Sequence, residues 1–280
     1  MVLGHTQSVQ QARPAPAGRE VMIAFEDVHF SQGPLKVLDG VSFEVRRGET
    51  TVILGPSGCG KSTLLWLMLG VWKPDSGRIR IEGEDTGHFT EADWKRVRGR
   101  LSMVFQENAL FDSLTVGENV GYRLFRERTL PPADIERKIR ETLQIVELDP
   151  DQFIDRRPDE LSTGQKRRVA IARAIANSDP EAIFYDEPTT GLDPRTARKV
   201  GDLIIRLRDS RGNTSVVVTH EIADALRLGD RFLLLDGGKV VFDGRAAGLL
   251  SSTHPQVQAF LEPFLMDVEE LAPRIAESPR

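Results

Sequence analysis

The segment from Thr51 to Ser62 constrains the fold of this chain more than any other part of the sequence. Thr51 to Leu54 is typical of a buried strand, and the octapeptide Gly55-Pro56-Ser57-Gly58-Cys59-Gly60-Lys61-Ser62 follows it directly. This octapeptide fits the pattern Gly-x4-Gly-Lys-Ser/Thr, and a helix is expected from about Lys61. A strand, a glycine-rich loop and a helix in this order predict an α/β protein that holds a phosphate group at the junction.

The residue types of this loop indicate how the phosphate is held. Glycines let backbone N–H groups turn towards the anion, and the start of the helix adds partial positive charge. Lys61 is expected to reach the β- and γ-phosphates, and the Ser62 hydroxyl to bind Mg²⁺. A chance glycine-rich turn is the alternative, expected in roughly one chain of this length in a hundred. The residues predicted to bind the nucleotide here are Gly55, Pro56, Ser57, Gly58, Cys59, Gly60, Lys61, Ser62 and Thr63.

Cys59 is the only cysteine of the chain, which excludes an internal disulfide. Its place near a helix N-terminus is a setting that lowers a thiol pKa, and a reactive thiol is one interpretation. The favoured interpretation is a small residue that fits the loop.

Composition excludes several other classes of protein. The 280 residues, of which 40% are hydrophobic, suffice for one large domain or two small ones. The net charge of −5 argues against a nucleic-acid partner. No run approaches the ~18 to 20 apolar residues of a transmembrane helix, so another chain would have to span any membrane involved. Residues 1–20 lack the apolar core of a signal sequence and are expected to form a disordered leader on a protein of the cytosol.

Hydrophobic patterns divide the remaining chain into three parts. Short β-rich runs between Val21 and Val45 predict an antiparallel subdomain. From about 106 to 180 the pattern is helical, with Ile135, Ile139 and Leu143 on one face. The α/β alternation then returns up to about residue 245. We therefore expect an α/β fold with a RecA-like P-loop core, an antiparallel β subdomain and an inserted α-helical subdomain.

Two acids follow a second apolar strand, Ala182 to Tyr185. Asp186 is expected to reach Mg²⁺ through water, and Glu187 to polarise the water that attacks the phosphate. Acids after a strand are more often part of a solvated turn, but the phosphate loop upstream favours the catalytic interpretation.

Leu161-Ser162-Thr163-Gly164-Gln165 resembles the L-S-G-G-Q signature of ABC ATPases, with Thr163 in place of the first glycine. A helix cap formed by Ser162 is the simpler interpretation, and both can hold at once. Gln106, Gly191-Leu192-Asp193 and His220 follow the order of the Q-loop, D-loop and switch histidine of that family. The resemblance covers about Val21 to Gly244 and implies the ABC ATPase fold with ATP and Mg²⁺ as cofactors.

The resemblance also implies roles for single residues. Ser162, Gly164 and Gln165 would grip the γ-phosphate of ATP that is bound to a partner subunit. Gln106 would sense Mg²⁺ and the attacking water, His220 would contact the γ-phosphate, and Asp193 would touch the opposite subunit. Phe30 would stack on adenine, with a core aromatic as the alternative. The catalytic set implied is Lys61, Gln106, Glu187 and His220.

One phosphate loop and one signature imply a second copy of the chain, in a head-to-tail dimer that sandwiches ATP. The resemblance further implies integral membrane permease subunits at the cytoplasmic face of the inner membrane. A module that binds ATP without cleaving it is disfavoured, because Lys61, Asp186, Glu187 and His220 are all present.

The segments 106–120 and 254–261 are similar to the lipid-asymmetry (Mla/Mkl) ATPases associated with MCE-domain proteins. This similarity implies lipid transport and an MCE-domain lipid-binding partner. Many of those ATPases carry Met where this chain has Gln165. Glutamine at this position is also usual in amino-acid, metal and lipoprotein-release systems. Those systems, and an ABC ATPase of regulation or assembly, are the alternatives.

The tail, residues 246–280, contains Pro255, Pro263 and Pro273 among apolar residues. We expect it to be too interrupted for one long helix. Its apolar character predicts that it docks on the partner subunit.

Overall fold

The computed structural model describes residues 19–127, 130–176 and 180–276. Of the leader expected at 1–20, residues 1–18 lie outside the described part. A six-stranded sheet forms the centre of the molecule, in the order β10-β9-β3-β8-β7-β6. Its strands are β3 (Thr50–Leu54), β6 (Leu101–Val104), β7 (Ala182–Asp186), β8 (Thr214–Val218), β9 (Arg231–Asp236) and β10 (Lys239–Gly244).

The central sheet is parallel except for β10, which pairs with β9 in a hairpin. Every residue of β3, β7 and β8 is buried. Continuous burial is typical of parallel strands that are covered on both faces. Because β3, β8 and β7 are neighbours and parallel, the residues that follow them meet at one edge of the sheet.

A second, four-stranded sheet has the order β2-β1-β4-β5. Its strands are β1 (Val21–Gln32), β2 (Leu35–Arg46), β4 (Ser76–Ile81) and β5 (Glu84–Asp85). The pairs β1–β2, β1–β4 and β4–β5 are antiparallel. Buried residues of this sheet, such as Phe25 and Val41, share one hydrophobic cluster with Ile53 of β3 and Leu65 of the helix after the phosphate loop. The second sheet therefore packs directly against the phosphate-binding part of the central sheet.

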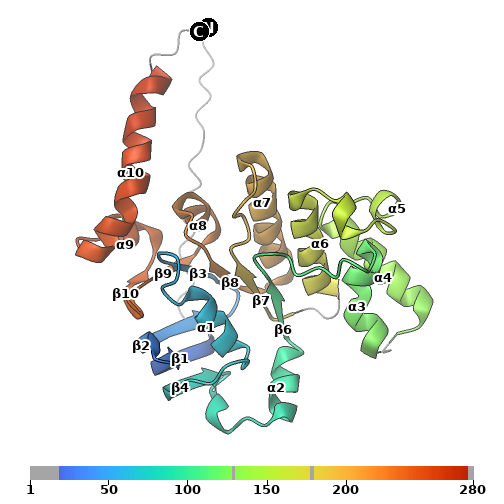
Figure 1. The fold of residues 1–280 in the computed structure, drawn as a ribbon, viewed down its shortest axis with the longest axis horizontal. Helices are drawn as coiled ribbons and strands as arrows, with labels where there is room; N and C mark the ends of the chain where they lie inside the picture. The colour runs from blue at the N-terminus through green and yellow to red at the C-terminus, as the bar shows by residue number, and fades with distance from the viewer. Residues whose placement is uncertain (1–18, 128–129, 177–179, 277–280) are drawn as a thin grey trace.

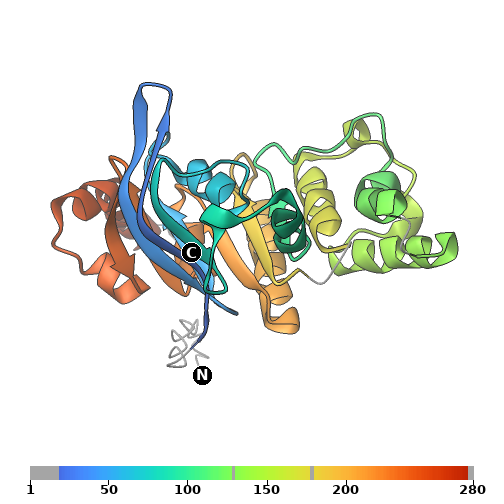
Figure 2. The same ribbon diagram turned by 90° about the horizontal axis from the view of Figure 1, so that it is seen from below.

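The helices fall into two groups (Figures 1 and 2). A helical lobe at one end of the molecule holds α3 (Val116–Glu127), α4 (Pro132–Ile145), α5 (Pro150–Phe153) and α6 (Thr163–Ala176), with the short turn η2 (Pro158–Glu160). Ile135, Ile139 and Leu143 are buried in this lobe, as their spacing predicts. The other helices before the tail are α1 (Lys61–Met68), η1 (Thr86–His88), α2 (Glu91–Arg98), α7 (Pro194–Arg211) and α8 (Ile222–Leu228).

The tail differs from the expectation. After α9 (Ala246–Leu250), one helix, α10, runs from Pro255 to Ala276, so the prediction that the prolines prevent a long helix is wrong. Pro255 is the first helical residue, where a missing N–H costs nothing. Val257 and Leu261 are buried against the core of the same chain, and this packing helps to offset the hydrogen bond that Pro263 removes.

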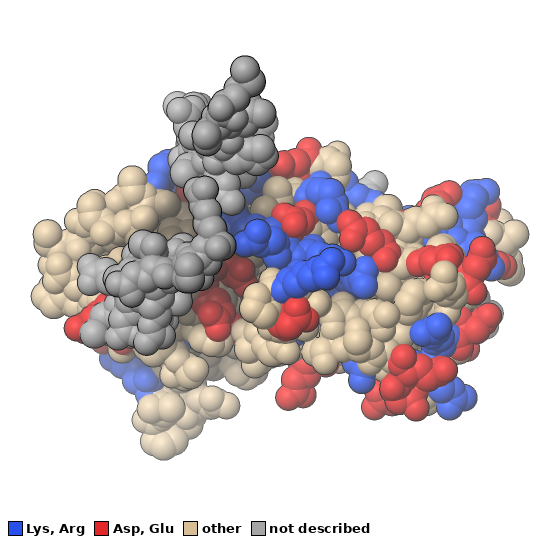
Figure 3. Space-filling view, turned by 90° about the horizontal axis from the view of Figure 1, so that it is seen from above, with Lys and Arg blue, Asp and Glu red and all other residues tan. Residues whose placement is uncertain are grey.

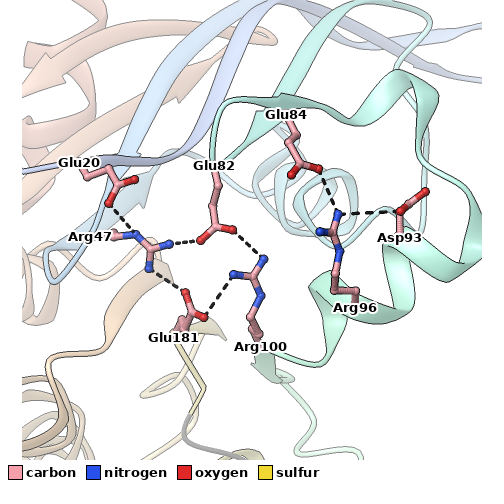
Figure 4. A network of polar contacts seen from close by, with 8 residues as sticks. All are labelled: Glu20, Arg47, Glu82, Glu84, Asp93, Arg96, Arg100 and Glu181. Carbon is pink, nitrogen blue, oxygen red and sulfur yellow. Dashed lines mark hydrogen bonds and ion pairs between the residues drawn. The ribbon is translucent and has the colours of Figure 1, made fainter.

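A closed ring of charges joins the two sheets at the edge where β7 begins (Figure 4). Arg47 contacts Glu82 and Glu181, and Arg100 lies 2.7 Å from Glu82 and 3.3 Å from Glu181. Each side chain is a quarter to a third exposed. The ring connects the end of β2 and the β4–β5 turn with the starts of β6 and β7. It therefore ties the antiparallel subdomain to the core on the side away from the phosphate loop.

Candidate nucleotide-hydrolysis site

The phosphate loop leaves β3 as a tight turn that only glycine permits. Gly55 has a φ of +150°, and a Cβ there would lie 2.2 Å from the Leu235 carbonyl oxygen. Lys61 Nζ donates to the carbonyl oxygens of Gly55 and Pro56, at 2.9 and 3.0 Å. The ammonium group is thus held over the loop. Gly60 is the N-cap residue of α1, and no side chain caps this helix end. This arrangement leaves a helix N-terminus and a buried cation facing the same turn, which suits a phosphate.

Asp186 ends β7 and reaches the first residues of α1. Ser62 Oγ donates to Asp186 Oδ1 at 3.2 Å. Burial raises the pKa of Asp186, while the hydrogen bond from Ser62 opposes that rise. In the described ranges, no group of three or more His, Cys, Asp and Glu side chains could hold a metal. A hydroxyl and a carboxylate oxygen are nonetheless the hard ligands that Mg²⁺ takes when phosphates and water supply the rest, so these two residues fit that ion.

Glu187 is fixed in place from three sides. Its φ of +48° is unusual for a residue with a side chain, and its N–H donates to the Val218 carbonyl at 2.9 Å. His220 Nδ1 lies 3.0 Å from Glu187 Oε1, and Thr190 Oγ1 donates to Oε2 at 2.8 Å. A backbone in this sparsely populated region costs ~1 to 3 kcal/mol and is found most often at functional sites. The fold therefore brings together two predicted catalytic residues, Glu187 and His220, that lie far apart in sequence.

Gln106 follows β6, the strand beside β7, and its side chain is exposed. The backbone at Phe105 and Gln106 is held instead by Arg167, whose guanidinium donates to both carbonyl oxygens at 2.7 Å. The structure thus places Gln106 one strand away from the two carboxylates.

The signature segment forms the N-terminus of α6 in the helical lobe. Ser162 N–H donates to Gln165 Oε1 at 2.8 Å, and Gln165 N–H donates to Ser162 Oγ at 3.3 Å. The interpretation of Ser162 as a helix cap is therefore confirmed, with Gln165 completing a capping box. Gly164 is buried, and a Cβ there would lie 2.3 Å from Thr196 Cγ2. In Figure 1, α6 lies in the lobe, whereas α1 lies beside the antiparallel sheet.

Phe30 was predicted to contact the nucleotide and Asp193 the dimer interface. In the structure, both side chains have partners in their own chain. Phe30 is only 8% exposed and stacks on Trp72, with ring centroids 5.3 Å apart and an interplanar angle of 10°. Asp193 Oδ1 accepts from the N–H groups of Arg195 and Thr196, both at 3.0 Å, and so caps α7. Hydrogen bonding from Thr196 lowers the pKa of Asp193. Phe30 fits the alternative of a core aromatic.

The favoured interpretation of Cys59, a small residue that fits the loop, agrees with the structure, whereas the lowered thiol pKa expected at a helix N-terminus is not found. Burial raises the pKa of its thiol, and the nearby charge of Lys61 only partly opposes that effect. Cys59 packs with the hydrophobic cluster under the loop, alongside Val37. A raised pKa leaves less thiolate at neutral pH, so Cys59 acts as a small packing residue.

Sequence reasoning missed Thr190, Trp72 and the contact made by Arg167. Thr190 and Trp72 stand in no pattern that marks them as parts of a site. Arg167 belongs to a basic run, Lys166 to Arg168, that was visible in the sequence. Such runs usually form a solvated face, and only the fold shows that Arg167 is buried at 2% exposure.

The site and fold together define an ATP-binding cassette. A family model described as ABC transporter matches residues 38–190. The chain is similar to the ATP-binding cassette MJ0796, solved as a dimer in a post-hydrolysis state with ADP and Pi. The TM-score is 0.73 at 33% identity, covering 80% of this chain and 98% of that one. The prediction of the fold class is confirmed.

Three relatives extend this similarity. The chain is 39% identical to protein TRIGALACTOSYLDIACYLGLYCEROL 3, chloroplastic, of Arabidopsis thaliana, covering 86% of this chain and 73% of that protein. It is 38% identical to the intermembrane phospholipid transport system ATP-binding protein MlaF of Escherichia coli, covering 86% and 88%. It is 39% identical to the sn-glycerol-3-phosphate import ATP-binding protein UgpC 1 of Rhizobium etli, covering 76% of this chain and 59% of that protein.

This chain belongs to the ABC transporter family, as an ATP-binding subunit. It is an ATPase that binds ATP and hydrolyses it to ADP and phosphate, coupled to transport. Over the described residues, the structure contains no helix that is long and apolar enough to cross a membrane.

Proposed function

We propose that the transporter served by this ATPase moves phospholipid or another lipid. The observation that carries the proposal is the extent of the similarity along this chain: the alignment with MlaF, named for intermembrane phospholipid transport, spans 86% of this chain, and the alignment with UgpC 1 spans 76%. Identity alone does not separate the two, at 38% and 39%. The longer stretch of similarity to MlaF favours the lipid system.

The second candidate is the ATPase of another importer or exporter. The 39% identity to an sn-glycerol-3-phosphate importer favours a polar substrate, and Gln165 is equally compatible with amino-acid, metal or lipoprotein-release systems. An ABC ATPase of regulation or assembly would need no membrane partner at all.

In the proposed mechanism, Lys61 and the phosphate loop bind the β- and γ-phosphates, and the loop amides orient them for attack. Ser62 and Asp186, with Gln106, would hold Mg²⁺, which would neutralise phosphate charge when bound. Glu187 accepts a proton from the attacking water. His220 keeps the Glu187 carboxylate in position at 3.0 Å and reaches the γ-phosphate.

We further propose that two copies assemble head to tail, so that each nucleotide lies between the phosphate loop of one copy and the signature of the other. The support is that α1 and α6 lie in different parts of one chain (Figure 1), so a complete site needs a second one. Asp193 would lie at this interface, and Phe30 would contact adenine.

A mixing experiment tests the head-to-tail arrangement. Lys61→Ala destroys the phosphate loop of one copy, and Ser162→Arg blocks the signature of the other. Each variant alone is expected to be inactive. A mixture restores turnover, because the mixed dimer contains one site with an intact loop and an intact signature. A mixture as inactive as its components would exclude the arrangement.

The proposed membrane partner is a permease at the cytoplasmic face of the inner membrane, with an MCE-domain protein as a further component. An open groove of about 460 Å³ lies beside the Q-loop and is lined by Phe105, Phe111 and Tyr122, among others. Phe111 is 42% exposed and packs against Tyr122, with ring centroids 4.5 Å apart and the rings tilted by 34°. An exposed aromatic over a groove suits the insertion of a partner helix.

Figure 3 shows basic and acidic side chains side by side over the face drawn there, unlike a nucleic-acid interface.

Purification of the tagged chain from native membranes in mild detergent tests the lipid assignment. Mass spectrometry is expected to identify a permease and an MCE-domain protein. Bound phospholipid should be extracted from the same complex. A different permease with a solute-binding protein would support the second candidate, and soluble partners alone would contradict a transport role.

A further inference from the structure

Arg167 is a buried cation that contacts the backbone of the loop after β6. Its side chain is 2% exposed, and its two terminal nitrogens donate to the consecutive carbonyl oxygens of Phe105 and Gln106. Both distances are 2.7 Å, and the donor lies about sixty residues beyond its acceptors in the chain. Among the described residues, Arg167 Nε has no hydrogen-bond partner. A buried guanidinium that contacts only backbone oxygens is costly and calls for a reason beyond packing.

The charges nearest to Arg167 are those of the catalytic strand. Burial lowers the pKa of Arg167, and the charges of Asp186 and Glu187 oppose that effect. Arg167 in turn lowers the pKa of Asp186, together with Ser62 and Lys61, while Glu187 raises it. The strand pairing agrees with this: Phe105 and Gln106 directly follow Val104, which pairs with Tyr185, the residue before Asp186, so Arg167 is bonded to backbone beside the carboxylate pair.

The helix that carries Arg167 begins at the signature. Gln165, which completes the capping box with Ser162, precedes Arg167 by two positions, so a shift of that end of α6 must move the guanidinium. Further along α6, Arg173 donates to the carbonyl oxygens of Asn108 and Ala109, at 3.0 and 2.7 Å. Both of these acceptors have positive φ, 64° and 47°, a conformation that is unfavourable for residues with side chains. The loop after β6 is thus held in a strained shape from α6.

We infer that Arg167 is a positioning residue for ATP hydrolysis, which fixes the backbone of Phe105 and Gln106 against the Asp186–Glu187 pair according to the position of α6. It acts through Gln106 and does not touch the nucleotide. The signature of a chain is thereby connected to the hydrolytic site of the same chain. This inference rests on the proposed roles of Gln106, Asp186 and Glu187.

The neighbouring Arg168 provides a matched control. It also extends from α6 and donates to a backbone carbonyl, that of Glu147 at 2.8 Å. Its acceptor belongs to the helical lobe and lies outside the Q-loop. Arg168→Met therefore removes a guanidinium from the same helix without releasing Phe105 or Gln106.

The test compares Arg167→Met, Arg167→Lys and Arg168→Met in the full chain, purified with its membrane subunits. Arg167→Met should lower kcat on the order of 100-fold through misplacement of Gln106, with KM for ATP within about twofold of wild type. Arg167→Lys keeps the charge and one carbonyl bond, so it should recover part of kcat.

A wild-type kcat for Arg167→Met, or an equal loss in Arg168→Met, would overturn the inference. If Arg167→Met fails to fold, Arg167→Lys decides: a lowered kcat at unchanged KM and melting temperature supports the inference, and wild-type kcat overturns it. Glu187→Gln separates this inference from the proposed site. An inactive Glu187→Gln beside a fully active Arg167 variant refutes only the role of Arg167, whereas an active Glu187→Gln refutes the site itself.

Discussion

The N-termini of α1 and α6 both belong to predicted phosphate-binding motifs, yet their ends are built differently. The α1 end begins at Gly60, with a φ of 106°, and no side chain caps it. The α6 end is closed by Ser162 and Gln165, each of which accepts the other's N–H. One helix end is therefore left for a ligand, and the other is satisfied without one.

This difference teaches how one chain can hold half of a two-chain site. At α1, Lys61 and the turn of Gly55 are already arranged around the place of the phosphate. At α6, in the proposed head-to-tail dimer, the capping box would keep the helix end stable until a nucleotide on another copy reaches it. Binding and closure can thus be separate steps, and variants of the two ends should fail in different ways.

The largest effect is expected from Lys61→Ala. Without the ammonium group, the α1 end loses its cation, and ATP affinity should fall at least about 100-fold, or ~2.7 kcal/mol. Calorimetric titration of the purified chain with ATP measures the change. Lys73→Ala, a lysine outside the loop, is the control. Unaltered binding by Lys61→Ala would remove the distinction between the two helix ends.

Glu187→Gln should leave binding intact and lower turnover by about 10² to 10⁴-fold, because the amide cannot accept the proton of the attacking water. ATP then persists, and the dimer that joins α1 of one copy to α6 of the other is trapped. Light scattering should report twice the monomer mass with ATP and the monomer without it. Thr190→Val, which removes only one hydrogen bond to Glu187, should show a much smaller loss of turnover. Wild-type turnover by Glu187→Gln would refute the proposed role of Glu187.

Gly164→Ala tests the α6 end alone. The new Cβ would meet Thr196 Cγ2 at 2.3 Å, so we expect a loss of ~1 to 3 kcal/mol in the free energy of unfolding. ATP affinity at the α1 end should not change. Denaturant unfolding measures the effect, and adding Thr196→Ser, which removes the clashing methyl group, should restore most of the stability. Failure of that rescue would contradict the steric explanation.

The smallest effect concerns Asp186 and pH. Because burial raises its folded pKa above the ordinary value of 3.8, its stabilising contribution is present below pH 3.8 and is lost as pH rises through the folded pKa. Asp186→Asn should therefore raise the melting temperature of the nucleotide-free chain at neutral pH, with the gain shrinking towards acid pH. Asp193→Asn should show the opposite sign, because hydrogen bonds lower that pKa. Equal shifts at all pH values would argue against both.

The predictions from sequence were most accurate for features that depend only on residues adjacent in the sequence. The phosphate loop, the start of α1 at Lys61, the strand that ends in Asp186 and the cap at Ser162 follow from local conformational demands. They were weaker where packing decides. The single helix α10 persists through Pro263 because Val257 and Leu261 are buried, and no local rule includes that burial.

The sequence by itself determined the strand, the glycine turn and the helix that bring Gly55, Lys61 and Ser62 together, because glycine at that spacing satisfies a need that is local to the backbone. Only the tertiary structure decided which distant groups meet. It set His220 beside Glu187, Arg167 beneath the Q-loop and Trp72 against Phe30. It also reversed the pKa expected for Cys59. The physical reason is that desolvation and contact depend on what surrounds a group in space, and those surroundings come from parts of the chain far away in sequence.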